Sequence, residues 1–510
     1  MIIHIMLERF TCASAPAPLA LLVGSVAASW IMTLFYSYYF HPYADIPGPF
    51  WAKISRFWLV RQVLRGDIHS TQRALHEKYG SIVRMAPDEV SISDPAALKV
   101  IYAVNAGFTK TDFYTPFAPH LSPHEDLFTQ RDEKIHAQRR RFVNNLYSLS
   151  SILESEAYVD ACILTFKDRL GEFAAQSDAF DLGLWLQMFA FDVIGELFYG
   201  KQFGFMENSH DYQGYIETLD TLLPAVATSC VLPFYLRPLH VLGHLIPPLH
   251  KALKGYDDIV VAAKETVARR QHEVDKGTVE RLVKNRAWTN IIAASKNGFT
   301  LADVATEAWV SLFAGSDTTA IAMRAILFNI IRNPKVYERL LAEIDQASAE
   351  GRLSNPAKYS EAIKLPYFVA CCKEGFRVHP SVGMSMPRHV PPTGVNIAGR
   401  YFPGGSRVGM SAHVVHFDKG IFGQDADCYN PDRWLQPGAE VMERYLMHFG
   451  AGPRTCVGKN ISITEIHKLI PSLLQDYEFL LSEPNKDLKY SNYWFNKQIG
   501  LNVLVSQRRK

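Results

Sequence analysis

The segment from Phe449 to Gly458 carries the most specific chemical pattern in this chain of 510 residues. It reads F-x-x-G-x-R-x-C-x-G, a glycine-rich loop with one cysteine, Cys456, and one arginine, Arg454. A cysteine thiolate is one of the few protein ligands of haem iron, and it donates electron density that favours O–O cleavage. An isolated cysteine is more often an inert buried residue. Five specified positions within ten residues instead indicate an iron ligand in a loop whose glycines let the backbone approach closely.

A second pattern, A-G-S-D-T-T at residues 314–319, lies in the middle of the clearest helical segment. That segment begins at a capping box formed by Thr300 and Asp303 and ends at Asn333–Pro334. A glycine inside a helix costs about 1 kcal/mol, and aspartate and threonine compete for backbone hydrogen bonds. These residues together predict a locally opened helix that admits a ligand or water, with a plain Ser/Thr-lined kink as the alternative.

A buried ion pair is predicted at Glu374 and Arg377, which lie three residues apart on one helical face. Their neighbours along the chain are mostly apolar, so the pair is expected in the core, where it needs further partners. Arg433, in the segment P-D-R-W, is the candidate partner.

The A-G-S-D-T-T helix, the E-x-x-R pattern and the cysteine loop, in this order along the chain, resemble the cytochrome P-450 haem-thiolate monooxygenases. The resemblance extends from about Ile46 to Gln507. The segment G-G-S-R-V-G-M-S at 404–411 is similar to filamentous-fungal microsomal members related to pisatin demethylase and benzoate para-hydroxylase. The resemblance implies a mainly α fold with small β-sheets, haem b with Cys456 as the axial iron ligand, and dioxygen as co-substrate.

The resemblance also implies roles for individual residues. Asp317 and Thr318 would relay protons during oxygen activation, a general-acid role. Glu374, Arg377 and Arg433 would form a structural triad that steadies the haem loop. Many relatives have tryptophan where this chain has histidine in the propionate-binding helix. The residues implied to bind haem are His136, Arg140, Arg388, Phe449, Arg454, Cys456 and Gly458.

The N-terminal region differs in composition from the rest, with no charged residue from Phe10 to Ala44. Its apolar part is long enough to cross a bilayer as one helix, and the basic residues that follow place the bulk of the chain in the cytosol. We expect a short lumenal N-terminus (1–18), a transmembrane anchor (19–40), a proline-rich neck (41–50) and one haem-thiolate domain (51–510). This predicts a single-pass protein of the endoplasmic reticulum membrane; a cleaved signal peptide is the alternative.

The remaining composition bears on partners. A formal net charge of +2 gives no reason to expect nucleic acid, and seven cysteines without framework spacing suit a reducing compartment. No flavin or nicotinamide motif is present, so the resemblance implies electrons from an NADPH-dependent flavoprotein reductase. The basic residues expected to attract that partner are Arg139, Arg141, Lys459 and Lys468. The residues expected to line an apolar pocket for a hydrophobic small molecule are 108–117, Leu312, Phe313, Val382 to Met386, Trp494 and Phe495.

Two interpretations stay open at this point. The apolar, proline-interrupted segment Leu222–Leu249 is either buried core or a mobile lid against the membrane. For function, a monooxygenase of secondary metabolism is favoured by the intact Asp317–Thr318 pair. The alternatives are a haem-thiolate isomerase or dehydratase that does not use dioxygen, and a non-catalytic haem-binding membrane protein. Alternation between Tyr79 and Ser93 further predicts a β-hairpin.

Overall fold

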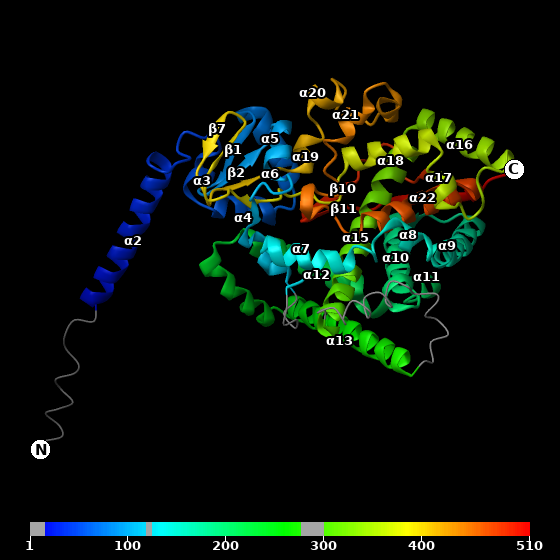
Figure 1. The fold of residues 1–510 in the computed structure, drawn as a ribbon, viewed down its shortest axis with the longest axis horizontal. Coiled ribbons are helices and arrows are strands. Elements are labelled where there is room, and N and C mark those ends of the chain that lie inside the picture. The colour runs from blue at the N-terminus through cyan, green and yellow to red at the C-terminus, as the bar shows by residue number, and fades with distance from the viewer. Residues whose placement is uncertain (1–15, 119–124, 277–299, 510) are drawn as a thin grey trace, which may run out of the picture.

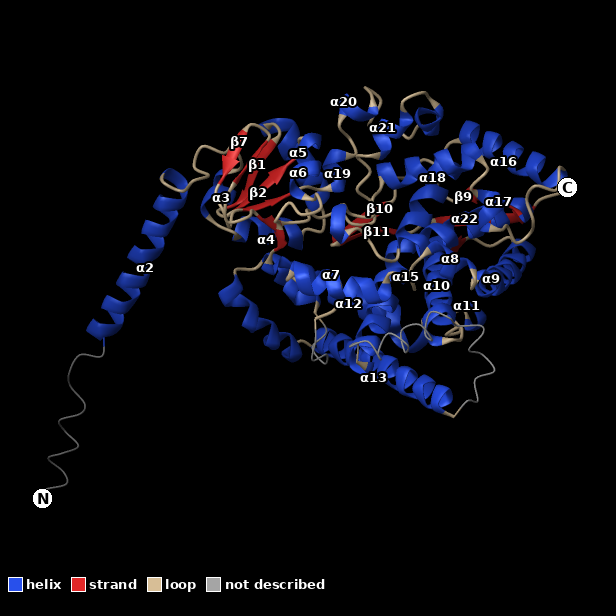
Figure 2. Cartoon of the chain, in the orientation of Figure 1, coloured by secondary structure: helices blue, strands red, loops and turns tan. Residues whose placement is uncertain are grey.

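The computed structural model describes residues 16–118, 125–276 and 300–509. Helices make up most of this part of the chain, and its strands form four small β-sheets (Figure 2). The largest sheet lies at the end of the molecule nearest the N-terminal helix, and helices surround the rest (Figure 2). The mainly α fold with small sheets is therefore confirmed.

Helix α2 (Pro16–Tyr39) extends away from the body of the protein and joins it beside α3 (Phe50–Ile54) (Figure 1). Its 24 residues span about 36 Å at 1.5 Å per residue. The side chains of Trp30, Ile31 and Phe35 are exposed. An exposed apolar helix of this length is unfavourable in water and favours an apolar environment.

Another apolar stretch, Leu182–Tyr199, is the part of the described chain that meets the length and hydropathy expected of a membrane span. It comprises α10 (Leu182–Ile194) and a π-helical turn, η3 (Gly195–Tyr199). Because 89% of it is buried inside the protein, it is a core helix.

The largest sheet has five strands in the order β1–β2–β8–β5–β3. Its first two strands form the predicted hairpin, in which Ile82 pairs with Ile92. Strand β5 lies between β8 and β3, so that Arg388 pairs with Lys110 across the antiparallel ladder. The strands are β1 (Ile82–Ala86), β2 (Glu89–Ile92), β3 (Thr109–Lys110), β5 (Arg388–His389) and β8 (Arg407–Gly409).

Helix α15 (Leu301–Arg332) passes through the main core and begins at the predicted capping box of Thr300 and Asp303. The predicted opening of this helix is wrong, because the helix continues without interruption through residues 314–319. The hydroxyls of Ser316 and Thr318 donate to backbone carbonyl groups one turn earlier, at 2.7 Å each, and so need no break in the helix.

Gly315 has a packing reason for its place inside α15. A Cβ at this position would lie 2.7 Å from Cδ1 of Ile194 on α10, closer than side chains tolerate. The glycine therefore allows close approach of α10 and α15, not a kink.

The Leu222–Leu249 segment divides into a buried part and an exposed part, and a mobile lid against the membrane stays a prediction. Its first half belongs to α12 (Tyr215–Val231), where Leu222 and Leu223 are buried. Its second half forms η5 (Phe234–Leu245) and the start of α13 (Pro247–Asp275). Apolar side chains of η5 are mostly exposed, including Phe234 at 74% and Leu245 at 77%.

The remaining elements frame the core and the site. The earlier helices are α4 (Phe57–Leu64), α5 (Ile68–Tyr79), η1 (Pro95–Ala97), α6 (Leu98–Ile101), η2 (Asp112–Phe117), α7 (Glu133–Val143), α8 (Leu149–Leu153), α9 (Glu156–Gln176), α11 (Phe205–Asn208) and η4 (Tyr212–Gly214). The later helices are α16 (Pro334–Ala349), α17 (Tyr359–Ala362), α18 (Pro366–Val378), α19 (Ala412–Val415), α20 (Lys419–Phe422), η6 (Pro431–Leu435), α21 (Ala439–Glu443), η7 (Gly452–Arg454) and α22 (Lys459–Asp476). The smaller sheets pair β6 (Val395–Ile397) with β7 (Arg400–Phe402), β10 (Lys489–Tyr493) with β11 (Phe495–Ile499), and β12 (Asn502–Gln507) with β4 (Phe180–Asp181) and β9 (Tyr477–Leu481).

Candidate active site

Cys456 lies in the loop between η7 and α22, close to the first turn of α22. Its sulfur accepts hydrogen bonds from the backbone N–H groups of Gly458 and Lys459. Burial raises the pKa of the Cys456 thiol, while these N–H groups and the positive charge of Arg140 act in the opposite direction. The side chain is nevertheless exposed to the space beside the loop. Donors and positive charge directed at an accessible sulfur are what a thiolate ligand requires.

The glycines of this loop act differently from one another. Gly452 has a φ of +64°, and a Cβ there would lie 1.6 Å from the carbonyl oxygen of Tyr102. No side chain fits at this position, so glycine at 452 allows the loop to contact the backbone at the end of α6. A Cβ on Gly458 would lie 3.9 Å from the Cys456 sulfur, an ordinary contact distance. Close approach to the sulfur therefore does not require glycine at 458.

Backbone contacts hold the cysteine loop in place. The N–H of Cys456 donates to the carbonyl oxygen of Phe449 at 2.8 Å. Arg140, which comes from α7, donates to the carbonyl oxygens of Thr455 at 2.7 Å and Pro453 at 3.2 Å. Arg140 thus stabilises the loop and also brings positive charge near the sulfur.

One face of α15 is open halfway along the helix. Ala314 is exposed and Thr318 is half-buried, whereas Leu312 and Thr319 beside them are buried. Residues 314 and 318 are one turn apart and therefore share a face. The Thr318 hydroxyl donates to the Ala314 carbonyl oxygen, which leaves its oxygen lone pairs free to accept from a group in this space.

Asp317 points elsewhere, into the interface between α15 and α10. Its carboxylate accepts a hydrogen bond from the side-chain amide of Gln187 on α10. Burial raises the pKa of Asp317, and the positive charge of Lys497 opposes that shift. The sequence pairs Asp317 with Thr318, but the structure places their side chains on neighbouring faces of the helix.

Basic side chains from four parts of the chain meet near the cysteine loop. Burial lowers the pKa of His136 to about 3, and the charges of Arg454 and Lys110 add to this effect. Burial and the charges of Arg388 and Arg454 likewise lower the pKa of Lys110 well below its usual value. The cluster consists of Lys110, His136, Arg140, Arg388 and Arg454.

This basic cluster carries more positive than negative charge. Among the residues that the structure describes, Glu133 is the carboxylate that pairs with it, at 2.8 Å from Arg454. Arg388 instead donates to the Tyr114 hydroxyl at 2.7 Å, and Lys110 donates to the carbonyl oxygen of Phe128. Buried unpaired charge is costly, so the cluster suits a ligand with two carboxylates.

The predicted ion-pair cluster is present in the core, between α18 and η6. Glu374 and Arg377 form a two-point contact at 2.7 and 2.8 Å, with both side chains fully buried. Arg433 donates to Glu374 at 3.0 Å, and the Trp434 ring N–H adds a bond at 2.9 Å. Arg377 also donates to the carbonyl oxygen of His416 at 2.8 Å. Every charge in this cluster has several partners, which burial demands.

Two of the basic residues expected to attract a redox partner are unsuited to that task. Lys468 is fully buried and pairs with Glu156 and Asp160 at 2.8 Å each. Arg139 pairs with Asp303 at 2.8 Å. Their charges are compensated inside the protein because each lies on the inner face of its helix.

A family model described as Cytochrome P450 matches residues 46–501. The chain belongs to the cytochrome P450 family. It is 39% identical over 474 residues to a cytochrome P450 monooxygenase of Penicillium aethiopicum, a match that covers 92% of this chain and 94% of the relative. Another relative, pisatin demethylase of Fusarium vanettenii, is 33% identical over 480 residues, with 93% and 92% covered. The resemblance to fungal P450 monooxygenases is confirmed, and the chain is an oxidoreductase of that class.

The residues around the site fit the haem and dioxygen use of the P450 family. Cys456 offers an accessible sulfur with two N–H donors, and the basic cluster lacks the carboxylates that would neutralise it. Lys110 belongs to that cluster but was not predicted from the sequence. In the sequence, Lys110 is a lysine within the aromatic run F-T-K-T-D-F-Y. Only the pairing of β3 with β5 shows that it lies beside Arg388.

An aromatic cluster of the P450 contains several of the residues that the sequence predicts to line the substrate pocket. The Trp494 ring lies 5.5 Å from the rings of Phe113 and Phe117 and 5.8 Å from that of Phe128. Met384 and Phe495 belong to the same cluster. Phe108 and Leu312 pack into other parts of the core, and their place in the substrate lining stays a prediction.

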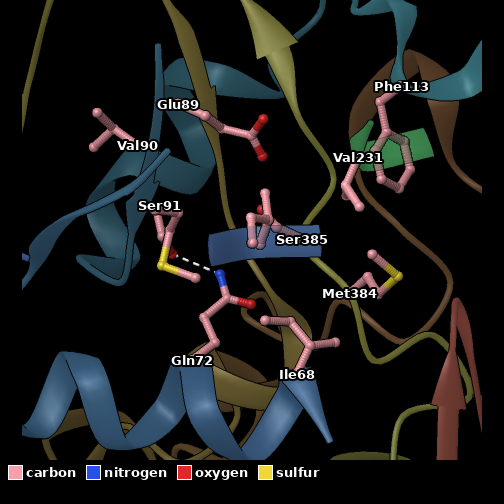
Figure 3. A pocket seen from close by; sticks show the side chains of 11 residues that line it. Ile68, Gln72, Glu89, Val90, Ser91, Phe113, Val231, Met384 and Ser385 are labelled. Atoms are coloured by element: carbon pink, nitrogen blue, oxygen red, sulfur yellow. Dashed lines mark hydrogen bonds between the residues drawn. The ribbon is translucent and has the colours of Figure 1, made fainter. Parts of the chain in front are cut away.

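A small pocket adjoins this aromatic cluster, between α5, the β1–β2 hairpin and the end of α12 (Figure 3). Phe113, Val231 and Met384 form its apolar side. On the opposite side Gln72 donates to the Ser91 hydroxyl at 2.7 Å (Figure 3). Its lining does not include Cys456 or Thr318, so it lies beside the catalytic region and not within it.

Proposed function

We propose that this P450 is a membrane-anchored haem-thiolate monooxygenase that inserts one oxygen atom of dioxygen into a hydrophobic small molecule of fungal secondary metabolism. The observation that carries the proposal is the Cys456 sulfur, accessible and bonded by the N–H groups of Gly458 and Lys459. Cys456 would hold the haem iron. The basic cluster around Lys110, Arg388 and Arg454 would bind the propionates. When bound, haem supplies the activation of dioxygen.

The other site residues would handle protons. One oxygen atom enters the substrate and the other leaves as water, which requires two electrons and two protons from outside. Thr318 presents a hydroxyl oxygen on the open face of α15. Asp317, the preceding residue, is buried, and burial raises its pKa, which favours the protonated form of its carboxyl. We assign Thr318 to accept a hydrogen bond at the reacting group and Asp317 to deliver protons.

The Glu374–Arg377–Arg433 triad would act structurally, by supporting the loop that carries Cys456. The aromatic cluster around Trp494 favours a substrate with apolar, ring-containing parts. Electrons would come from an NADPH-dependent flavoprotein reductase. Arg141 and Lys459, which are exposed, remain suitable for attracting an acidic partner.

Membrane association is supported by two features of the fold. Helix α2 has the length of a bilayer span and exposed apolar side chains. The exposed apolar residues of η5 provide a second surface suited to the bilayer interface. We propose a single-pass protein of the endoplasmic reticulum with its catalytic domain in the cytosol. Deletion of residues 1–40 should release the protein from alkaline-washed microsomes; full retention would contradict anchoring by α2.

The function is tested by spectroscopy and labelled dioxygen. The reduced, carbon-monoxide-treated protein should show the red-shifted absorption of a thiolate-ligated haem, and Cys456→Ala should abolish it. Cys428→Ala is the matched control, because Cys428 is also exposed but lies away from the loop. Metabolite profiling of a deletion strain identifies the substrate that accumulates. Its conversion under labelled dioxygen should add one labelled atom; an unlabelled product would favour the isomerase or dehydratase alternative.

A further inference from the structure

Gln187 bridges an acid and a base in the buried interface between α10 and α15. Its side-chain N–H donates to Oδ1 of Asp317. Its carbonyl oxygen accepts a hydrogen bond from Nη2 of Arg324 at 2.9 Å. All three side chains are at most 3% exposed. The neutral amide therefore occupies the space in which Asp317 and Arg324 would otherwise form a direct ion pair.

Arg324 is satisfied without any carboxylate in contact. Its guanidinium donates to the Gly183 carbonyl oxygen at 2.6 and 2.9 Å and to that of Gln498 at 3.3 Å. The carboxylates of Asp181, Asp317 and Asp220 act on Arg324 through their charge, and none of these three makes a hydrogen bond with it. Gln187 completes this shell of neutral acceptors, which keeps the guanidinium turned away from Asp317.

One of the two carboxylate oxygens of Asp317 makes no hydrogen bond within the described part of the chain. This oxygen, Oδ2, is buried. A buried polar atom of this kind calls for a proton or an ordered water molecule. The other charged groups that act on Asp317 are Arg324 and the Lys497–Asp220 pair. That pair joins β11 to α12, and Asp220 is 44% exposed, so it connects this region to solvent.

We propose that Gln187 is a positioning residue for proton delivery: it holds the Asp317 carboxyl in the interface between α10 and α15 and prevents direct pairing with Arg324. The inference rests on the function proposed above. A direct contact with the Arg324 guanidinium would favour the charged form of the Asp317 carboxyl and keep that carboxyl at the arginine. With the amide between them, Asp317 carries a proton on Oδ2, releases it on the Thr318 side of α15, and takes a replacement from solvent at the Lys497–Asp220 end.

Infrared titration of the haem-loaded protein tests this directly. The infrared band of the protonated Asp317 carboxyl is assigned by its absence in the Asp317→Asn variant. In Gln187→Ala, Arg324 is free to reach Asp317, so the midpoint of the band should fall by about one to three pH units. Gln187→Leu keeps this space filled but removes the amide donor that favours the carboxylate, so its midpoint should rise instead. An unchanged midpoint in both variants would overturn the proposal.

A matched control is available at Gln475 on α22, which is 3% exposed and donates to the Ser348 hydroxyl at 3.0 Å. Gln475→Leu removes a buried amide far from Asp317 and should leave the titration unchanged. With a flavoprotein reductase, the Gln187 variants should also release severalfold more hydrogen peroxide per NADPH than the native protein, at equal haem content. An equal peroxide yield would count against the proposal.

The two proposals fail in different ways. If the thiolate absorption depends on Cys456 but the titration midpoint of Asp317 is the same in the Gln187 variants, this inference fails and the proposed function stands. If haem binds without Cys456, the proposed function fails whatever the infrared result.

Discussion

Lys110 on β3 and Arg388 on β5 lie directly opposite each other in the five-stranded sheet, both nearly fully buried. Two neighbouring cations repel each other unless a negative group lies between or beside them. The protein uses antiparallel pairing to concentrate positive charge at one place. That arrangement destabilises the folded protein without ligand and becomes favourable once a ligand with two negative charges is bound.

Replacing Lys110 should therefore affect haem binding and stability in opposite directions. In Lys110→Met the haem-free protein should be as stable as native or more so, because burial and the charges of Arg388 and Arg454 disfavour the charged form of Lys110. Haem should dissociate faster, corresponding to a loss of about 1.5–3 kcal/mol for a charged hydrogen bond. Haem-transfer kinetics and urea unfolding measure the two effects. Lys468→Met, which breaks a buried pair with Glu156 and Asp160, should instead destabilise the haem-free protein.

Glu374 should be among the most sensitive positions for folding. Glu374→Ala removes the shared acceptor of Arg377 and Arg433, both buried. The expected loss is about 3–5 kcal/mol in the free energy of unfolding. The exposed pair of Glu483 and Lys486 is the control, and Glu483→Ala should cost less than about 1 kcal/mol. Similar losses in denaturant unfolding of the two variants would show that burial of the cluster is unimportant.

Gly452→Ala should displace the cysteine loop. The added Cβ would overlap the Tyr102 carbonyl oxygen, and the φ of +64° adds strain. We expect loss of most thiolate-ligated haem, measured by the carbon monoxide difference spectrum. Gly405→Ala separates the two causes, since Gly405 has a φ of +81° but open space around it. It should cost only the backbone strain, about 1–3 kcal/mol, with normal haem content.

Glu307 on α15 should make stability depend on pH. Burial, reinforced by the negative charge of Asp126, raises its pKa to about 8. A raised pKa in the folded state means that the stabilisation is complete below the unfolded value near 4.5 and is lost as pH rises toward 8. Glu307→Gln, which retains an acceptor for the Leu127 N–H, should remove this loss. Its stability relative to native should rise between pH 5 and pH 8 in urea unfolding; a constant difference would contradict the assignment.

Several features of this P450 were predictable because their partners lie nearby in the chain. The capping box at Thr300 and Asp303, the β1–β2 hairpin and the Glu374–Arg377 pair all join residues within one turn or one hairpin. The predicted opening of α15 failed for a reason invisible in the local sequence. Gly315 packs against Ile194, which is more than a hundred residues away in the chain.

The amino-acid sequence by itself determined the family and predicted the cysteine ligand and the acid–alcohol pair, because residue type and short spacing decide whether such chemistry is available. Only the tertiary structure decided where the side chains act. It turned Asp317 toward Gln187 and away from the open face of Thr318, joined Lys110 to Arg388, and buried Lys468 among carboxylates. Strand pairing and helix packing bring together residues far apart in the chain, and no local pattern encodes those distances.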